Sequence, residues 1–105
     1  MVFAGENFWG RTLAACSSST DPSCYEGFGP YMPGFHIVPY NDLKALEEIC
    51  KDPEVCAFMV EPIQGEAGVK VPDLGYYAGI RKICSENNVL WIADEIQTGL
   101  GRTGK

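Results

Sequence analysis

The sequence predicts an α/β fold with a mainly parallel sheet. Two unbroken apolar runs, at residues 55–60 and 89–93, have the length of strands and lack polar alternation, which predicts strands buried on both faces. Between them, residues 74–87 carry apolar side chains at helical spacing. The order strand, loop, helix, strand is that of a right-handed βαβ unit with parallel strands.

The first half of the chain is expected to add two shorter strands. Residues 1–4 have the composition of the end of a strand, and residues 35–38 form a short strand closed by Pro39. Residues 17–34 are crowded with Ser, Gly and Pro, which predicts a long irregular loop. Loops of that length inside compact domains are often functional.

Three polar residues are predicted to cap helices. Asn7 precedes a short helix through residues 10–15, Asn41 a helix over residues 42–51, and Asp73 the long helix described above. The apolar faces of the two longer helices are expected to carry Leu43, Leu46, Ile49 and Cys50, and Tyr77, Ile80, Ile83 and Cys84.

Composition limits the classes of function. The 105 residues suffice for one small domain, and a hydrophobic content of 46% indicates a globular chain. A net charge of −6 without basic clusters argues against a nucleic-acid partner. No apolar run approaches the ~20 residues that span a bilayer.

The five cysteines do not suggest a metal site. Their number is odd, no pair has C-x-x-C spacing, and the sequence has one histidine, His36. Free, partly buried thiols in a reducing compartment are the favoured interpretation of Cys16, Cys24, Cys50, Cys56 and Cys84.

Two of the predicted strands end in an acid. Glu61 follows the first apolar run and Asp94 follows the second. Because parallel strands end at the same edge, both carboxylates are expected in one region, where open α/β sheets bind ligands. Each acid alone could instead cap a helix or solvate a loop. Further polar residues follow nearby: Gln64, Glu66, Gln97 and Arg102.

Three ordered motifs resemble the class III (subgroup III) pyridoxal-phosphate-dependent aminotransferases. They are NFWGRT at residues 7–12, VEPIQGEAG at residues 60–68 and ADEIQTGLGRTG at residues 93–104. The resemblance covers essentially the whole chain and implies part of the large, PLP-binding domain of a fold type I transferase.

The resemblance is strongest to the branch of this family that converts ornithine. The residues that carry this finer likeness are Trp9 after Phe8, the SSSTDP loop at residues 17–22 and the PYNDL segment at residues 39–43. The implied reaction moves the δ-amino group of ornithine to 2-oxoglutarate, giving glutamate 5-semialdehyde and glutamate. Acetylornithine or 4-aminobutyrate aminotransferases of the same family remain alternatives.

The resemblance implies a role in cofactor binding for three residues. Asp94 would keep the pyridine nitrogen of pyridoxal 5'-phosphate protonated, which makes the ring an electron acceptor. Gln97 would hydrogen-bond the phenolic oxygen of the ring, and Phe8 would stack on its face. The alternatives are a strand-end acid, a loop amide facing solvent and a core phenylalanine.

Other residues are implied to act on the substrate. Arg11 would clamp a substrate carboxylate, for which its two-pronged geometry is suited. Glu66 would engage a second arginine elsewhere in the protein, Trp9 would lie on the substrate side, and Glu61 would orient neighbouring polar groups. Arg102 would lie near a dimer interface. Surface or packing roles remain open for each of them.

The chain is expected to be a central piece of a longer enzyme. The resemblance places a phosphate-binding turn upstream, and a Schiff-base lysine and a small domain downstream. Lys105 is not that lysine, because it belongs to the Arg-Thr-Gly loop. The piece alone is therefore expected to be inactive, and a truncated product that only associates with full-length subunits remains an alternative.

The resemblance also implies a setting for the complete protein. It would be a homodimer or higher homo-oligomer that acts on amino and 2-oxo acids. It would work in the mitochondrial matrix, or in the cytoplasm of a prokaryote.

Overall fold

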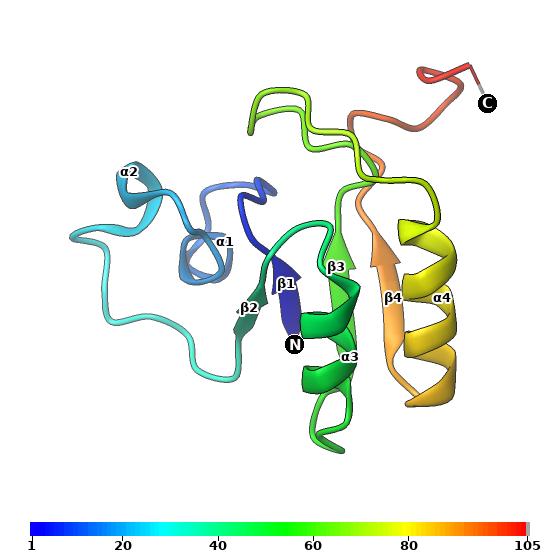
Figure 1. Cartoon of the computed structure of the whole chain (residues 1–105). Helices are drawn as coiled ribbons and strands as arrows, with labels where there is room; N and C mark the ends of the chain where they lie inside the picture. The colour runs from blue at the N-terminus through cyan, green and yellow to red at the C-terminus, as the bar shows by residue number, and fades with distance from the viewer. Residues whose placement is uncertain (105) are drawn as a thin grey trace.

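The computed structural model describes residues 1–104 and contains a four-stranded, all-parallel sheet with the strand order β2-β1-β3-β4 (Figure 1). The strands are β1 (Val2–Ala4), β2 (His36–Val38), β3 (Ala57–Val60) and β4 (Leu90–Ala93). The helices are α1 (Leu13–Ser17), α2 (Pro22–Tyr25), α3 (Leu43–Cys50) and α4 (Tyr76–Glu86). The predicted α/β class with a parallel sheet is confirmed.

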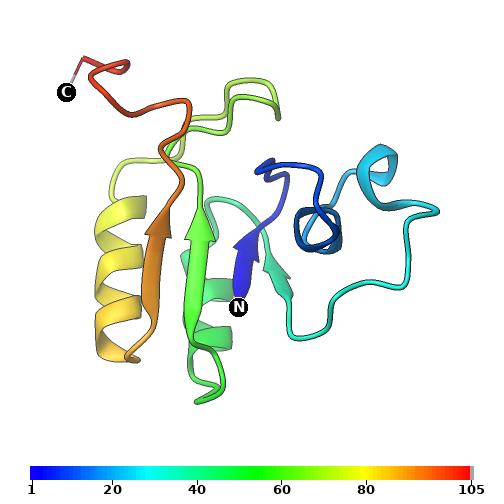
Figure 2. The same cartoon turned by 180° about the vertical axis from the view of Figure 1, so that it is seen from behind.

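Two helical crossovers place one layer of helices on the sheet. The connection through α3 passes from β2 over β1 to β3, and the connection through α4 joins the neighbours β3 and β4. Both advance in the same direction across the sheet, so right-handed connections put both helices on the same face. Figures 1 and 2, seen from opposite sides, show this arrangement. The loops after β1, β3 and β4 gather at the edge where the strands end.

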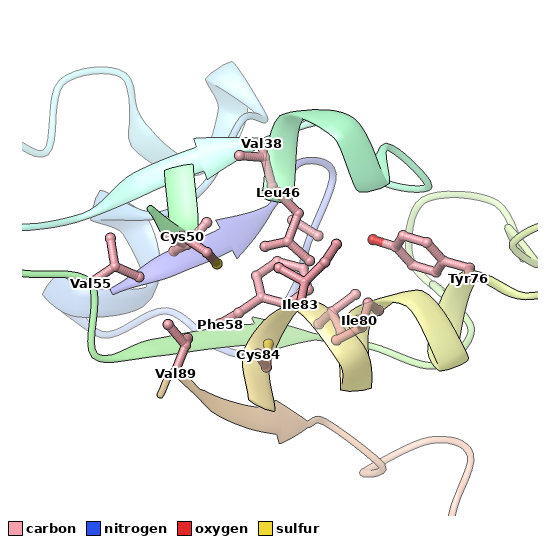
Figure 3. Packing of buried hydrophobic residues seen from close by; sticks show 13 residues of the cluster. Val38, Leu46, Cys50, Val55, Phe58, Tyr76, Ile80, Ile83, Cys84 and Val89 are labelled. Atoms are coloured by element: carbon pink, nitrogen blue, oxygen red, sulfur yellow. The ribbon is translucent and has the colours of Figure 1, made fainter. Parts of the chain in front are cut away.

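The core lies between α3, α4 and the sheet face that they cover (Figure 3). Phe58 of β3, Leu46 of α3 and Ile80 of α4 are fully buried there. Burial raises the pKa of the Cys84 thiol to about 11 and also raises that of Cys50, so both thiols stay protonated at neutral pH. The expected core residues all lie in or against this cluster: Leu43, Leu46, Ile49, Cys50, Tyr77, Ile80, Ile83 and Cys84.

The opposite face of the sheet carries a row of apolar side chains. The strand register aligns Ile37, Phe3, Met59 and Ile92 across all four strands. Phe3 is covered by the ring of Trp9, which stacks on it with centroids 5.6 Å apart. Ile37 and Ile92, at the two ends of the row, are 42% and 38% exposed.

The strand at residues 89–93 is less buried than its composition predicted. Leu90 is 70% exposed, while Trp91 packs partly buried against the core. The reason is topological: within the described residues β4 is an edge strand that pairs with β3, and α4 covers one of its faces. The prediction of burial on both faces is therefore wrong for β4 in this chain.

The first predicted helix begins later than expected. Thr12, rather than Asn7, caps α1, and its hydroxyl oxygen accepts a hydrogen bond from the Ala15 N–H at 3.2 Å. The Asn7 amide instead donates to the carbonyls of Ala4 and Ser18, both at 2.8 Å. Asn7 thus joins the end of β1 to the end of α1.

Local differences also occur at the other helix starts. Asp42 caps α3 one residue after Asn41, which adopts φ 66°. Gly75, with φ 91°, precedes α4 in place of the predicted cap Asp73. The loop predicted at residues 17–34 contains the short helix α2. The sequence therefore predicted the presence of α1, α3 and α4, but it missed α2 and did not locate the helix starts correctly.

Two composition-based expectations concern the whole described chain. Its five cysteines are free thiols; Cys50 and Cys84 are buried and Cys16 and Cys24 partly buried, whereas Cys56 is exposed, contrary to the expectation of partial burial. Among residues 1–104, none of the helices combines the length and apolar character needed to cross a membrane.

Candidate active site

A cavity of about 270 Å3 lies where the loops after β1, β3 and β4 meet. It contains both strand-end acids, so the predicted meeting of Glu61 and Asp94 is observed. Its lining residues are Phe8, Trp9, Gly10, Glu61, Ile63, Asp94, Ile96 and Gln97.

Asp94 is fixed to the sheet by its backbone. Its N–H donates to the Val60 carbonyl at 3.0 Å, which extends the pairing of β3 and β4 by one residue. The carboxylate accepts a hydrogen bond from the Ile96 N–H at 3.2 Å, so its orientation is tied to the turn that follows. A half-buried negative charge is therefore held at the carboxyl end of the sheet.

Glu61 is the more buried acid, with 9% of its surface exposed. Burial raises the pKa of this carboxyl group, and the carboxylates of Asp94 and Glu66 raise it further. The Phe8 N–H, which donates to Glu61 Oε1 at 3.0 Å, opposes these effects. Glu61 thus holds the backbone N–H of Phe8 at the edge of the cavity.

A second hollow, of about 320 Å3, adjoins the first. Arg11, Glu66 and Asp21 line it, and Phe8 lines both hollows. The Arg11 guanidinium carbon lies 5.6 Å from the centroid of the Phe8 ring, a cation–π distance. A substrate cation or carboxylate entering here would meet charges of both signs.

Hydrogen bonds hold Asp21 in the wall of this second hollow. Asp21 accepts a hydrogen bond from the Ser23 N–H at 2.9 Å. The pKa of Asp21 is lowered mainly by its hydrogen bonds to Ser23, with a smaller contribution from the charge of Arg11. Asp21 therefore stays ionised beside the arginine.

Gln97 extends from the loop after β4 toward the loop after β3. Its Nε2 lies 3.5 Å from Glu66 Oε1, at the limit of a hydrogen bond. Gln97 and Glu66 are exposed, and they line the first and the second hollow respectively. The pair therefore connects the two hollows.

Trp9 is anchored to the fold as well as lining the first cavity. Its indole N–H donates to Ser18 Oγ at 2.7 Å, and the Ser18 hydroxyl donates to the Ala15 carbonyl at 3.0 Å. Together with its stacking on Phe3, these contacts fix the position of the indole.

Gln64 was noted in the sequence as a polar residue near the strand-end acids, without a specific role, and in the structure it is fully buried. Its Nε2 donates to the Gly5 carbonyl at 2.8 Å, and its backbone pairs with Lys70. The Lys70 ammonium forms an ion pair with Glu6 at 2.5 Å. Gln64 therefore fastens the loop after β3 to the loop after β1. Its partner Gly5 is 59 residues away in the sequence, so no local pattern indicated the contact.

None of the lysines among residues 1–104 lines the cavity that contains Asp94. Lys44 and Lys82 are exposed on helices, Lys51 pairs with Glu48, and Lys70 pairs with Glu6. Lys105 lies outside the described residues. Arg102 is exposed in the turns after β4.

A family comparison covers the whole chain. The aminotransferase class-III family matches residues 1–105. The chain belongs to the class-III aminotransferases. The resemblance predicted from the three motifs is thus confirmed, and the class-III aminotransferases are transferase enzymes.

Individual relatives agree with this assignment. The chain is 69% identical over 105 residues to the mitochondrial ornithine aminotransferase of Rattus norvegicus. It matches the crystallised ornithine aminotransferase of Toxoplasma gondii at 57% identity with a TM-score of 0.97, covering 99% of this chain and 24% of that one. An acetylornithine aminotransferase from Elizabethkingia anophelis has 42% identity and a TM-score of 0.71, over 99% of this chain and 21% of the other. The chain spans about a quarter of the length of the curated relatives it matches.

The family and the Toxoplasma structure, whose description reports partial occupancy of PLP at the active site, point to pyridoxal phosphate as the cofactor. The residues around the first cavity fit a protonated pyridine ring chemically. They offer a carboxylate fixed at its edge, an amide and a flat aromatic ring.

Proposed function

We propose that a protein containing these residues is an ornithine aminotransferase that uses pyridoxal 5'-phosphate. It would transfer the δ-amino group of ornithine to 2-oxoglutarate and form glutamate 5-semialdehyde and glutamate. The observation that carries the proposal is the meeting of Asp94, Phe8 and Gln97 at one cavity, in a chain 69% identical to a relative of that name.

Three residues would hold the cofactor. Asp94 would lie against the pyridine nitrogen, where its negative charge favours retention of the proton. Phe8 would stack on the ring, and the Gln97 amide would hydrogen-bond the phenolic oxygen. When bound, the cofactor supplies an electron sink for the substrate carbon that carries the amine.

The second hollow would hold the substrate. The Arg11 guanidinium would bind a substrate carboxylate through paired N–H donors, and its contact with Phe8 would place that carboxylate beside the cofactor. Glu66 would neutralise an arginine from another part of the protein, and Trp9 would bound the substrate channel. Glu61 would act through Phe8 as an orienting group.

The test is an enzyme of the relatives' full length that contains this segment. We expect turnover with ornithine to exceed turnover with acetylornithine or 4-aminobutyrate, each assayed separately. The 42% identity to an acetylornithine enzyme makes acetylornithine the main rival substrate. Equal or greater turnover with either rival would contradict the ornithine assignment.

Removal of the Asp94 charge should have a large effect on the reaction. Asp94→Ala is expected to lower turnover about 100- to 1000-fold while the protein stays folded. Glu95→Ala, which removes the exposed neighbouring charge, is the matched control and should retain activity. Near-normal turnover of the Asp94 variant would refute its role.

The 105 residues alone are expected to lack transaminase activity, because none of the described lysines lines the cavity. We infer a homodimer or larger homo-oligomer for the complete protein. A mitochondrial location would agree with the names of several relatives.

The alternative is that the segment acts only by associating with full-length subunits. Mixing the segment with the intact enzyme would test this alternative, and an absence of mixed oligomers would contradict it.

A further inference from the structure

Gly65 and Gln97 approach each other more closely than any larger residue at position 65 would allow. A Cβ built on Gly65 would lie 1.9 Å from Gln97 Oε1 and 2.8 Å from Gln97 Cδ. Both distances are far below van der Waals contact. The Gln97 amide therefore occupies the space that a side chain at position 65 would fill.

The backbone at Gly65 does not itself require glycine. The glycines with positive φ are Gly10, Gly27, Gly34, Gly68, Gly75, Gly101 and Gly104, and Gly65 is not among them. An L-residue can adopt the backbone conformation of Gly65 without strain. The requirement for glycine arises from the approach of Gln97.

A side chain at position 65 would displace the Gln97 amide rather than the backbone. The atoms in conflict are at the far end of a flexible, exposed side chain. The only side-chain hydrogen bond of Gln97 in the described structure is the 3.5 Å contact with Glu66, which is too long to hold it firmly. The amide would therefore rotate away with little change in the free energy of unfolding.

We propose that Gly65 is a positioning residue, whose missing side chain keeps the Gln97 amide where it can hydrogen-bond the cofactor. This inference rests on the proposed function, because it assumes that Gln97 contacts pyridoxal phosphate. It predicts that one methyl group added at position 65 has the same effect on cofactor binding as removal of the Gln97 amide.

The experiment compares four forms of an enzyme of the relatives' full length: the parent, Gly65→Ala, Gln97→Ala and the double variant. The dissociation constant of pyridoxal phosphate is measured by titrating each apoprotein and following tryptophan fluorescence. Each single variant should bind about tenfold more weakly, which corresponds to about 1.4 kcal/mol. In the double variant, Gly65→Ala should add nothing, because the amide that it displaces is already gone.

Gly5→Ala is the matched control for adding a methyl group to a glycine. A Cβ there would lie 3.6–3.8 Å from its neighbours, in ordinary contact. The melting temperatures of the Gly5→Ala and Gly65→Ala apoproteins should both stay near that of the parent. A large loss of stability confined to Gly65→Ala would overturn the proposal, because it would show that the backbone had moved.

Two results separate this inference from the proposed function. If Gln97→Ala weakens binding and Gly65→Ala does not, the positioning role of Gly65 fails and the cofactor role of Gln97 stands. If Gln97→Ala leaves the affinity unchanged, the cofactor role itself fails, and the inference fails with it. A crystal structure of the Gly65→Ala apoprotein should show the Gln97 amide displaced; an unmoved amide would also overturn the inference.

Discussion

The loops that form the site are held in two different ways. The loop after β1 and the loop after β3 are fastened to each other by direct hydrogen bonds. The Phe8 N–H donates to Glu61 at 3.0 Å, and the Gln64 amide donates to Gly5 at 2.8 Å. Both acceptor and donor side chains are buried, so these bonds do not compete with water.

The loop after β4 is held mainly by bonds within itself. The Gly99 N–H donates to Glu95 at 2.8 Å, and the Ile96 N–H donates to Asp94 at 3.2 Å. Its side-chain hydrogen bond to the other loops comes from the exposed Gln97. The half of the site that carries Phe8 is thus preorganised by burial, whereas the half that carries Gln97 depends on the fit of one side chain.

Two glutamines give the sharpest test of this difference. Gln64→Ala should lower the free energy of unfolding by about 2–3 kcal/mol, because it leaves the Gly5 carbonyl without its partner and opens a cavity. Gln97→Ala, on an exposed side chain, should change it by less than about 0.5 kcal/mol. Chemical denaturation of the two variants in the full-length background measures both values, and similar losses would contradict the comparison.

The second prediction concerns the pH dependence that Glu61 adds to the tightly held half. Because its folded-state pKa is raised, Glu61 contributes stability that is complete below its unfolded-state pKa and is lost as pH rises through the folded-state pKa. Glu61→Gln removes this titration and keeps an acceptor for the Phe8 N–H. We therefore expect the variant to gain in stability relative to the parent as pH increases from acid to neutral.

Melting temperatures recorded across that pH range would show the effect. A difference between the parent and Glu61→Gln that is independent of pH would mean that burial does not shift this carboxyl group. Glu95→Gln, which changes an exposed acid, serves as the control.

The smallest effect is expected from the exposed ion pair between Lys70 and Glu6, although it also joins the two fastened loops. Surface ion pairs contribute about 0–1 kcal/mol and are screened by salt. Lys70→Met should therefore destabilise the protein slightly at low salt and less at high salt. A loss as large as that of Gln64→Ala would show that the ion pair, rather than the buried amide, fastens the loops.

Much of the fold could be predicted because its signals are local. The apolar runs that became β3 and β4 and the helical spacing of Leu46 and Ile80 indicate elements whatever surrounds them. The exposure of Leu90 could not be predicted, because it depends on the place of β4 at the edge of the sheet.

The caps and the site show the same limit. Asn7 has the composition of a helix cap, but its amide joins Ala4 to Ser18. The meeting of Glu61 and Asp94 followed from parallel strand order, whereas the Gly65–Gln97 contact required the structure. Contacts that strand topology implies could be predicted, and contacts that depend on side-chain fit could not.

The position of β1 in the interior of the sheet has a consequence for biosynthesis. Val2 is translated before either of its neighbours, which pair with it at His36 and Phe58. During translation this strand must leave the ribosome with both edges unpaired and remain so until β2 and β3 follow. Pairing of β1 along both of its edges therefore becomes possible only after β3 has been synthesised.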